Sequence, residues 1–234
     1  MSLILKKIVA SHHQNLPFVC FNKPNTKKLK AYFGNNDSLR YSDSFKEEGF
    51  VFAPFHNENP SIVFLKETSE VIEELYIKNS IDTSDSEFKE YESAKNSHIA
   101  LVLAGIDAIK SNSFKKVVLS RKELVALTSF DLLQVFENLL QKYDHAFVYV
   151  WFHPKVGLWM GATPERLVTL KNREFHTTAL ASTQNYEGNS NPIWGNKEIK
   201  EHQFVIDYIV SQIKDQQDGI ILKNFSISDT YTIK

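Results

Sequence analysis

The stretch AFVYVWFHPKVGLWMGA, residues 146–162, predicts two neighbouring β-strands joined by a tight turn. Its apolar and aromatic residues favour an extended chain on either side of residues 153–157, where Pro154 and Gly157 suit a turn. Two further strands follow in the same hairpin style, at residues 166–170 and 175–183, with a turn at residues 172–174. Successive hairpins predict an antiparallel sheet.

Outside these strands the chain alternates between β-rich and helical segments. Short apolar runs at residues 18–21, 50–52 and 61–65 predict a mostly β region at the start of the chain. Apolar residues at helical spacing predict helices over residues 87–110, from a cap near Ser129 through Leu140, and over residues 196–216. The run KKVVLSRKELVA, residues 115–126, predicts one more strand. An antiparallel sheet combined with long helices indicates the α+β class.

The composition is that of an ordinary globular chain. Of 234 residues, 42% are apolar, and 27 basic residues nearly balance 28 acidic ones. Because the net charge is −1 and no long basic block occurs, nucleic acid and anionic membranes are disfavoured as partners, and a small molecule is expected. The single cysteine, Cys20, cannot form an internal disulfide, and no apolar run reaches the length of a signal-peptide core or a membrane span. We therefore expect a cytoplasmic protein that is a monomer or a weak homo-oligomer.

Four charged residues stand out because they interrupt apolar surroundings or share a helix face. Lys116 precedes Val-Val-Leu, and Glu165 lies at the turn in GATPERL. Glu198 and Glu201 are three residues apart on the predicted C-terminal helix. The residues alone leave a simpler interpretation open. In it, all three glutamates are solvated, and Glu198 and Glu201 are stabilised by the dipole at the N-terminus of the helix. The sequence lacks the nucleophile elbow, the P-loop, the dinucleotide-binding glycines and the HExxH zinc motif.

The order of four short motifs resembles the chorismate-utilising enzymes. KVVLSR, GATPERL, TALAST and KEIKEH follow one another between Lys116 and His202. This family includes isochorismate synthase, salicylate synthase, anthranilate synthase component I and aminodeoxychorismate synthase. The resemblance implies a fold of two stacked antiparallel sheets flanked by helices, which agrees with the α+β class reached from the residues.

The residue at position 116 separates two kinds of chemistry within that family. Isochorismate and salicylate synthases resemble this chain in carrying lysine there, whereas the ammonia-using synthases carry glutamine. Making isochorismate adds water at C2 of chorismate and expels the C4 hydroxyl, which requires a general base and a general acid. The resemblance implies that Lys116 is the base, in a neutral form favoured by apolar neighbours. It implies that Glu165 is the acid, kept protonated in a shielded pocket.

The other two motifs imply metal and substrate binding. Glu198 and Glu201 match acidic positions that in the family help to hold Mg²⁺ against a substrate carboxylate. The family's substrate-binding stretch is matched by Leu180, Ala181, Ser182 and Thr183. Ala181 leaves room for water where aminodeoxychorismate synthases place a nucleophilic lysine. Ser182 stands where glycine is usual, and residues 184–186 replace the usual arginines, so the shape of this loop is expected to differ.

The resemblance also implies how the whole chain is arranged. We expect one chorismate-binding domain over residues 1–234, with a divergent, mostly β region at 1–86 and the motif-bearing core at 87–234. Family members continue past the position of Lys234 with a substrate-binding arginine and further metal-binding glutamates. We therefore expect the domain to be truncated at its C-terminus, and the chain by itself to bind Mg²⁺ weakly and to be inactive.

Three functions are left open by these residues. The favoured one is isochorismate synthase, serving menaquinone or siderophore biosynthesis. A salicylate synthase, which goes on to eliminate pyruvate, would share Lys116 and Glu165. A catalytically incompetent relative would act only as a binding module and would gain no thermal stability from Mg²⁺ and chorismate, whereas a competent site would.

Overall fold

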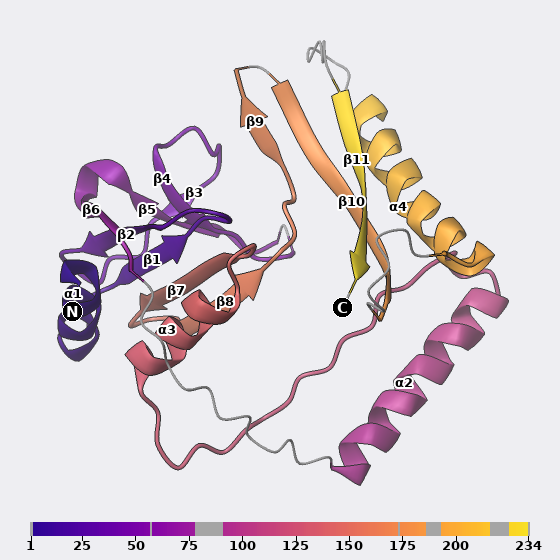
Figure 1. The fold of residues 1–234 in the computed structure, drawn as a ribbon, viewed down its shortest axis with the longest axis horizontal. Coiled ribbons are helices and arrows are strands. Elements are labelled where there is room, and N and C mark those ends of the chain that lie inside the picture. Colours follow the sequence, from indigo (N-terminus) through magenta and orange to yellow (C-terminus); the bar gives the residue numbers. More distant parts are fainter. Residues whose placement is uncertain are drawn as a thin grey trace. The chain divides into compact units, whose positions relative to one another are not determined.

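A computed structural model describes residues 2–56, 58–77, 91–172, 174–185, 193–215 and 225–233. It shows an α+β chain, as expected, with four α-helices among the described residues. The chain divides into two compact units, each built from two separate segments (Figure 1). The first unit comprises Met1–Ser84 and Leu127–Pro164, and the second comprises Asp85–Ala126 and Glu165–Lys234. The chain thus passes between the units three times. The two regions expected from the sequence, 1–86 and 87–234, would be joined by one passage only.

The first unit is built on a five-stranded antiparallel sheet with the order β6-β2-β1-β7-β8. Its strands are β1 Phe18–Asn22, β2 Lys28–Gly34, β6 Ser69–Leu75, β7 Phe147–His153 and β8 Gly157–Thr163. β7 and β8 form the predicted hairpin, closed by a hydrogen bond of 2.9 Å from the Val156 N–H to the His153 carbonyl oxygen. Gly157 has a φ of 117°, which glycine adopts without a Cβ clash. β7 also pairs with the N-terminal strand β1, so the local hairpin becomes part of a longer-range sheet.

Two helices cover one face of this sheet. They are α1 Leu3–His13 and α3 Leu132–Lys142. The fully buried residues of the shared core include Ile4, Ile8, Phe18, Cys20 and Phe136. Because side chains alternate along a strand, Phe18 and Cys20 face the helices, while Val19 and Phe21 belong to the core on the opposite face. The apolar stripe predicted for α3 is confirmed.

The helix caps of the first unit differ from the sequence-based expectation. α3 begins after Asp131 rather than near Ser129, and Asp131 Oδ1 accepts a hydrogen bond from the Gln134 N–H at 2.9 Å. α1 was not predicted at all. The backbone N–H groups of its first two residues donate to the Glu74 carboxylate at 3.2 and 3.0 Å. Ser2 is the N-cap of α1, and its hydroxyl oxygen accepts a hydrogen bond from the Leu5 N–H at 3.1 Å. Glu74 of β6 adds a second, long-range cap that no local sequence pattern can reveal.

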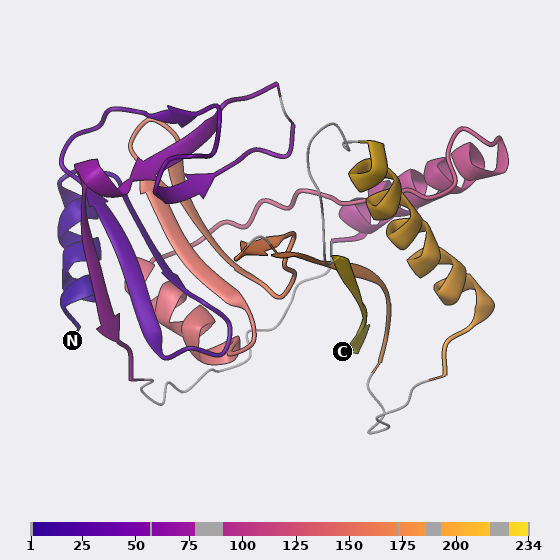
Figure 2. The same ribbon diagram turned by 90° about the horizontal axis from the view of Figure 1, so that it is seen from above.

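A second, three-stranded antiparallel sheet lies against the other face (Figure 2), in the order β3-β5-β4. Its strands are β3 Tyr41–Ser42, β4 Gly49–Phe52 and β5 Ser61–Leu65, and the 3-10 helix η1 Lys66–Thr68 connects β5 to β6. The contact between the sheets is aromatic. The fully buried Trp151 ring of β7 lies 4.7 Å from the Phe52 ring and 6.0 Å from the Phe64 ring, between centroids. The first unit therefore has three layers, namely helices, large sheet and small sheet.

The second unit contains two helices and a three-stranded sheet. Its elements are α2 Glu92–Lys110, α4 Asn196–Asp215, β9 Thr169–Lys171, β10 Glu174–Gln184 and β11 Phe225–Ile233. β10 pairs antiparallel with β9 and parallel with β11. The helices predicted over residues 87–110 and 196–216 are confirmed where they are described, while residues 87–90 and 216 lie outside the described residues.

Two sequence-based expectations are wrong here. Residues 115–126 form no strand, because the described residues offer them no neighbouring strand with which to share backbone hydrogen bonds. Residues 166–170 do not pair with 158–162, since β8 pairs with β7 and β9 pairs with β10. Pro164, which lacks an N–H donor, follows the last residue of β8. The apolar residues that predicted α2 include Val102, Ile106 and Ile109, and in the described structure they are exposed.

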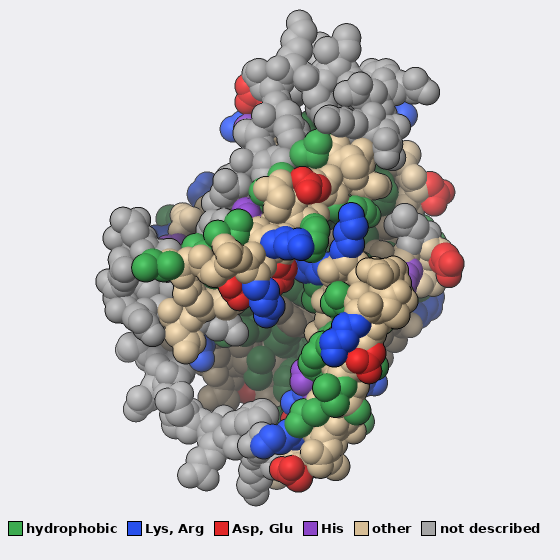
Figure 3. Space-filling model, turned by 90° about the vertical axis from the view of Figure 1, so that its right-hand side faces the viewer, with side chains coloured by type: hydrophobic (Ala, Val, Ile, Leu, Met, Phe, Trp, Pro, Cys, Tyr) green, Lys and Arg blue, Asp and Glu red, His purple; other side chains and the backbone are tan. Residues whose placement is uncertain are grey.

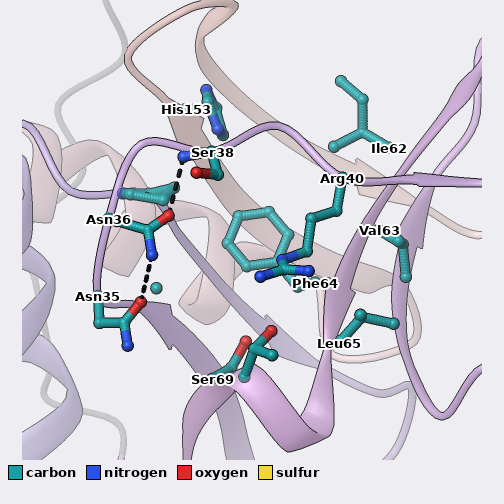
Figure 4. Close-up of a pocket in the computed structure, with 13 residues that line it drawn as sticks. Asn35, Asn36, Ser38, Arg40, Ile62, Val63, Phe64, Leu65, Ser69 and His153 are labelled. Carbon is teal, nitrogen blue, oxygen red and sulfur yellow. Dashed lines mark hydrogen bonds between the residues drawn. The ribbon is translucent and has the colours of Figure 1, made fainter.

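His153 ends β7 and is buried, with only 2% of its surface exposed. Figure 4 shows its ring beside Ser38 at a small cavity in the first unit, and none of the predicted site residues lines this cavity. Nδ1 of His153 accepts a hydrogen bond from the Lys155 N–H at 3.2 Å. Burial lowers the pKa of His153 below its ordinary value of 6.5. The backbone of Ser38 and the Asp37 carboxylate raise the pKa, but by less than burial lowers it.

The buried histidine predicts a pH-dependent stability. Since the folded-state pKa of His153 is lowered, the unfolded chain binds more protons than the folded chain below pH 6.5. The free energy of unfolding should be highest above that pH and should decrease as the pH falls, by at most about 1.4 kcal/mol per pH unit from this group. His153→Asn keeps an acceptor for the Lys155 N–H but cannot titrate, so it should flatten the profile. Urea unfolding across this pH range measures the effect, and an unchanged slope in the variant would contradict it.

Candidate functional site

Lys116 lies in the irregular segment that follows α2 and packs against it. Val117 and Leu119 face Gly105 of that helix, where an added Cβ would lie 3.4 Å from Val117 Cγ1 and 3.1 Å from Leu119 Cδ1. Glycine at this position therefore permits a close approach of the segment to the helix. Val118 is 82% exposed. The apolar surroundings expected around Lys116 are thus only partly present.

Lys116 forms an ion pair with Glu201 of α4. Its Nζ lies 3.3 Å from Glu201 Oε1, and the two side chains are 23% and 35% exposed. A fully exposed ion pair contributes about 0–1 kcal/mol to stability. Solvent weakens a partly shielded pair less than an exposed one. The structure thus brings together two predicted site residues from segments that are far apart in the sequence.

An open depression of about 1020 Å³ surrounds this ion pair. Its charged lining consists of Lys115, Lys116, Lys197, Lys200 and Glu201. Its apolar lining consists of Ile109, Phe114, Val117 and Phe204. Figure 3 views the molecule from the right-hand side of Figure 1, where α2 and α4 lie, and shows basic side chains next to hydrophobic ones on that face. Such a lining suits a small anionic ligand with an apolar part.

Glu198 lies in the first turn of α4 and does not line the depression. Its half-buried carboxylate folds back over Gly195, where an added Cβ would lie 2.6 Å from Oε2. In the part of the chain that the structure describes, no three His, Cys, Asp or Glu side chains gather closely enough to hold a metal ion. Of the two predicted metal-binding carboxylates, Glu201 is held by Lys116 and Glu198 lies against Gly195.

The predicted substrate-binding stretch lies on β10, outside the lining of the depression. Its residues are Leu180, Ala181, Ser182 and Thr183. Ser182 has a φ of 68°, in the left-handed region, where the pairing register of β10 with β11 is interrupted. The Ser182 hydroxyl donates a hydrogen bond of 2.9 Å to the Glu198 carbonyl oxygen. Glycine would suit this backbone conformation, and serine adds a bond to the first turn of α4.

Two substitutions at Ser182 should therefore differ in their effect on stability. Ser182→Ala keeps a Cβ at positive φ and loses the hydrogen bond, so it should lower the free energy of unfolding by about 1 kcal/mol. Ser182→Gly also loses the bond but relieves backbone strain of about 1 kcal/mol, so it should be nearly neutral. Thermal unfolding of the two variants measures this order, and a glycine variant less stable than the alanine variant would contradict it.

Glu165 does not join the pair of Lys116 and Glu201 in the described structure. It is exposed, in the irregular residues 164–168 between β8 and β9, and forms no hydrogen bond or ion pair with any described residue. The shielded surroundings expected for a general acid are absent around it. Its catalytic role stays a prediction.

Three residues of α4 were not singled out from the sequence. Lys197 and Lys200 line the depression, and they place positive charge in the first turns of a helix, where the dipole disfavours it. This unfavourable placement of two lysines could have been noticed in the sequence as a sign of a functional site. His202 is 3% exposed, and its Nε2 lies 3.1 Å from the Ala179 carbonyl oxygen, so this nitrogen donates and holds α4 against β10. Sequence alone could not reveal this contact, because it depends on the packing of the helix on the strand.

Comparison with known proteins supports the family resemblance that the order of the four motifs indicated. A family model described as "Chorismate binding enzyme" matches residues 55–227, about three quarters of the chain. The chain therefore belongs to the chorismate-binding enzyme family, and this membership indicates an enzyme that acts on chorismate. Comparisons with curated proteins and with solved structures found no match. Within the described ranges, no helix is both long and apolar enough to cross a membrane.

Proposed function

We propose that this protein is an isochorismate synthase, which converts chorismate to isochorismate. The observation that carries the proposal is the ion pair of Lys116 with Glu201 in a lysine-lined depression, in a chain of the chorismate-binding enzyme family. Lysine at position 116, rather than glutamine, favours water over ammonia as the nucleophile. The reaction is an isomerisation, because the water added at C2 balances the hydroxyl lost from C4.

In the proposed reaction, the ammonium group of Lys116 first gives up one proton to solvent, and the neutral amine then takes a proton from water as the water oxygen bonds to C2. The ring double bond shifts, the C4–oxygen bond breaks, and Glu165 supplies the proton that lets the leaving hydroxyl depart as water. The Glu201 carboxylate lies 3.3 Å from Nζ and so holds the side chain of the base in place. Each of these steps requires the substrate to be held between the two groups, which is where much of the rate acceleration arises.

We propose Mg²⁺ as the cofactor, held by Glu201 and Glu198. The support for this ion is the chemistry of the two side chains, because Mg²⁺ is commonly bound by one or two carboxylates and keeps several waters and substrate oxygens. Glu198 lies outside the lining of the depression, so its carboxylate would have to turn away from Gly195 to share the ion with Glu201. When bound, it would supply positive charge to a substrate carboxylate. Glu201 would then interact with the ion in addition to Lys116, so the ion pair and the metal would share one carboxylate.

Product analysis tests this function. The full-length gene product that contains residues 1–234 is incubated with chorismate and Mg²⁺, and the products are separated by chromatography. Isochorismate without pyruvate is the expected result. Salicylate together with pyruvate would instead support a salicylate synthase, which shares Lys116 and Glu165. The absence of any product, together with no thermal stabilisation by Mg²⁺ and chorismate, would overturn the proposal in favour of a binding module.

A further inference from the structure

The depression around Lys116 contains three lysines in addition to the proposed base. The chain as a whole is balanced, with 27 basic and 28 acidic residues, yet this lining holds four lysines and one glutamate. That glutamate is paired with Lys116. The other lysines, Lys115, Lys197 and Lys200, form no ion pair with any residue in the described ranges. Unpaired ammonium groups around a hollow raise the local concentration of anions.

Lys197 and Lys200 occupy positions that local helix energetics disfavour. α4 begins at Asn196, so both lysines lie near its positive end. Lys200 Nζ also lies 5.9 Å from the centroid of the Phe204 ring, one turn further along the helix, which restrains the ammonium group. Neither lysine has an ion pair with a described residue that would offset this cost, and residues that violate a local rule are expected at functional sites. The helix N-terminus adds its own attraction for an anion.

The same hollow offers an apolar surface. Ile109, Phe114 and Val117 line it from the end of α2 and the segment that follows. A ligand that matches both features has a carbon ring, which packs on these side chains, and carboxylates, which meet the lysines. Chorismate has this chemistry, since it combines a ring with two carboxylates.

We propose that Lys197 and Lys200 are the carboxylate-binding residues of this site, which makes the depression selective for cyclic dicarboxylates. This inference rests on the proposed function and assigns substrate recognition to residues distinct from the proposed base and acid. Lys116 and Glu201 act on the reacting water, while Lys197 and Lys200 hold the substrate by its charge.

A charge-matched pair of double variants tests the proposal. Lys197→Gln/Lys200→Gln removes the two lysines, and Lys122→Gln/Lys171→Gln removes two exposed lysines of the same unit that lie outside the depression. Chorismate affinity, measured by calorimetry, should fall about tenfold or more in the first variant and should stay unchanged in the control. In the full-length gene product, KM should rise while kcat is largely retained. Added salt should weaken binding more in the wild type than in the first variant. Equal affinities in the two double variants would overturn the proposal.

Two simple probes separate this inference from the proposed function. Isophthalate carries a ring and two carboxylates, whereas benzamide carries a ring and no charge. If chorismate is not converted but isophthalate binds, benzamide does not, and the Lys197→Gln/Lys200→Gln variant loses isophthalate, the recognition site stands and the isochorismate synthase assignment fails. If chorismate is converted and the variant leaves affinity and KM unchanged, the assignment stands and the recognition site is overturned.

Discussion

Replacing Lys116 by glutamine should lower isochorismate formation by about 10²- to 10⁴-fold in the full-length gene product, since this is the usual contribution of a general base. Chorismate binding should be largely retained, because the base acts on water. Glutamine can still donate a hydrogen bond toward Glu201, which lies 3.3 Å from Lys116 Nζ in the wild type, so the contact between α4 and the segment after α2 should persist.

Steady-state kinetics with product chromatography measures this loss, and calorimetry measures the retained binding. Lys122→Gln is the matched control, because Lys122 is an exposed lysine of the same segment that does not line the depression. It should leave the rate unchanged. Wild-type rates in the Lys116→Gln variant would show that another group takes the proton from water, and the proposed role of Lys116 would be wrong.

Trp151→Ala should lower the free energy of unfolding of the first unit by about 3–5 kcal/mol. Trp151 is fully buried between the two sheets, and its ring stacks on Phe52 at 4.7 Å and meets Phe64 edge-on at 6.0 Å. Truncation leaves a cavity that the surrounding strands cannot fill without breaking their pairing. Because the stability of a natural protein is about 5–15 kcal/mol, this loss is a large share of the total.

Denaturant unfolding followed by circular dichroism measures this loss. Trp151→Phe is the control, because it keeps an aromatic ring and removes an indole N–H that has no hydrogen-bond partner among the described residues. The phenylalanine variant should lose much less stability than the alanine variant. Equal losses in both variants would mean that the ring packing of Trp151 does not hold the sheets together.

Sequence patterns predicted the elements that local interactions determine. The hairpin of β7 and β8 could be predicted because its two apolar runs flank a short turn that contains Pro154 and is followed by Gly157, so the paired strands are neighbours along the chain. The helices α3 and α4 were readable because apolar residues recur at helical spacing. Residues 115–126 failed as a strand because a strand also needs a partner, and apolar content alone does not provide one. The hairpin of β9 and β10 was predicted from its turn at residues 172–174 and is confirmed. The parallel pairing of β11 with β10 was not predicted, because the two strands are far apart along the chain.

For the candidate site, too, some features were predictable from the sequence and others depended on the tertiary structure. The sequence by itself determined which residue types are available, because the motif order pointed to Lys116, Glu165, Glu198 and Glu201. Only the tertiary structure decided which of them meet, since packing of α4 and of the segment after α2 places Lys116 against Glu201 and gathers Lys197 and Lys200 around them. Glu198 turns to Gly195, and Glu165 is exposed. The physical reason is that a motif records residue types along the chain, whereas electrostatic contacts act over a few ångströms in space and depend on how the elements pack.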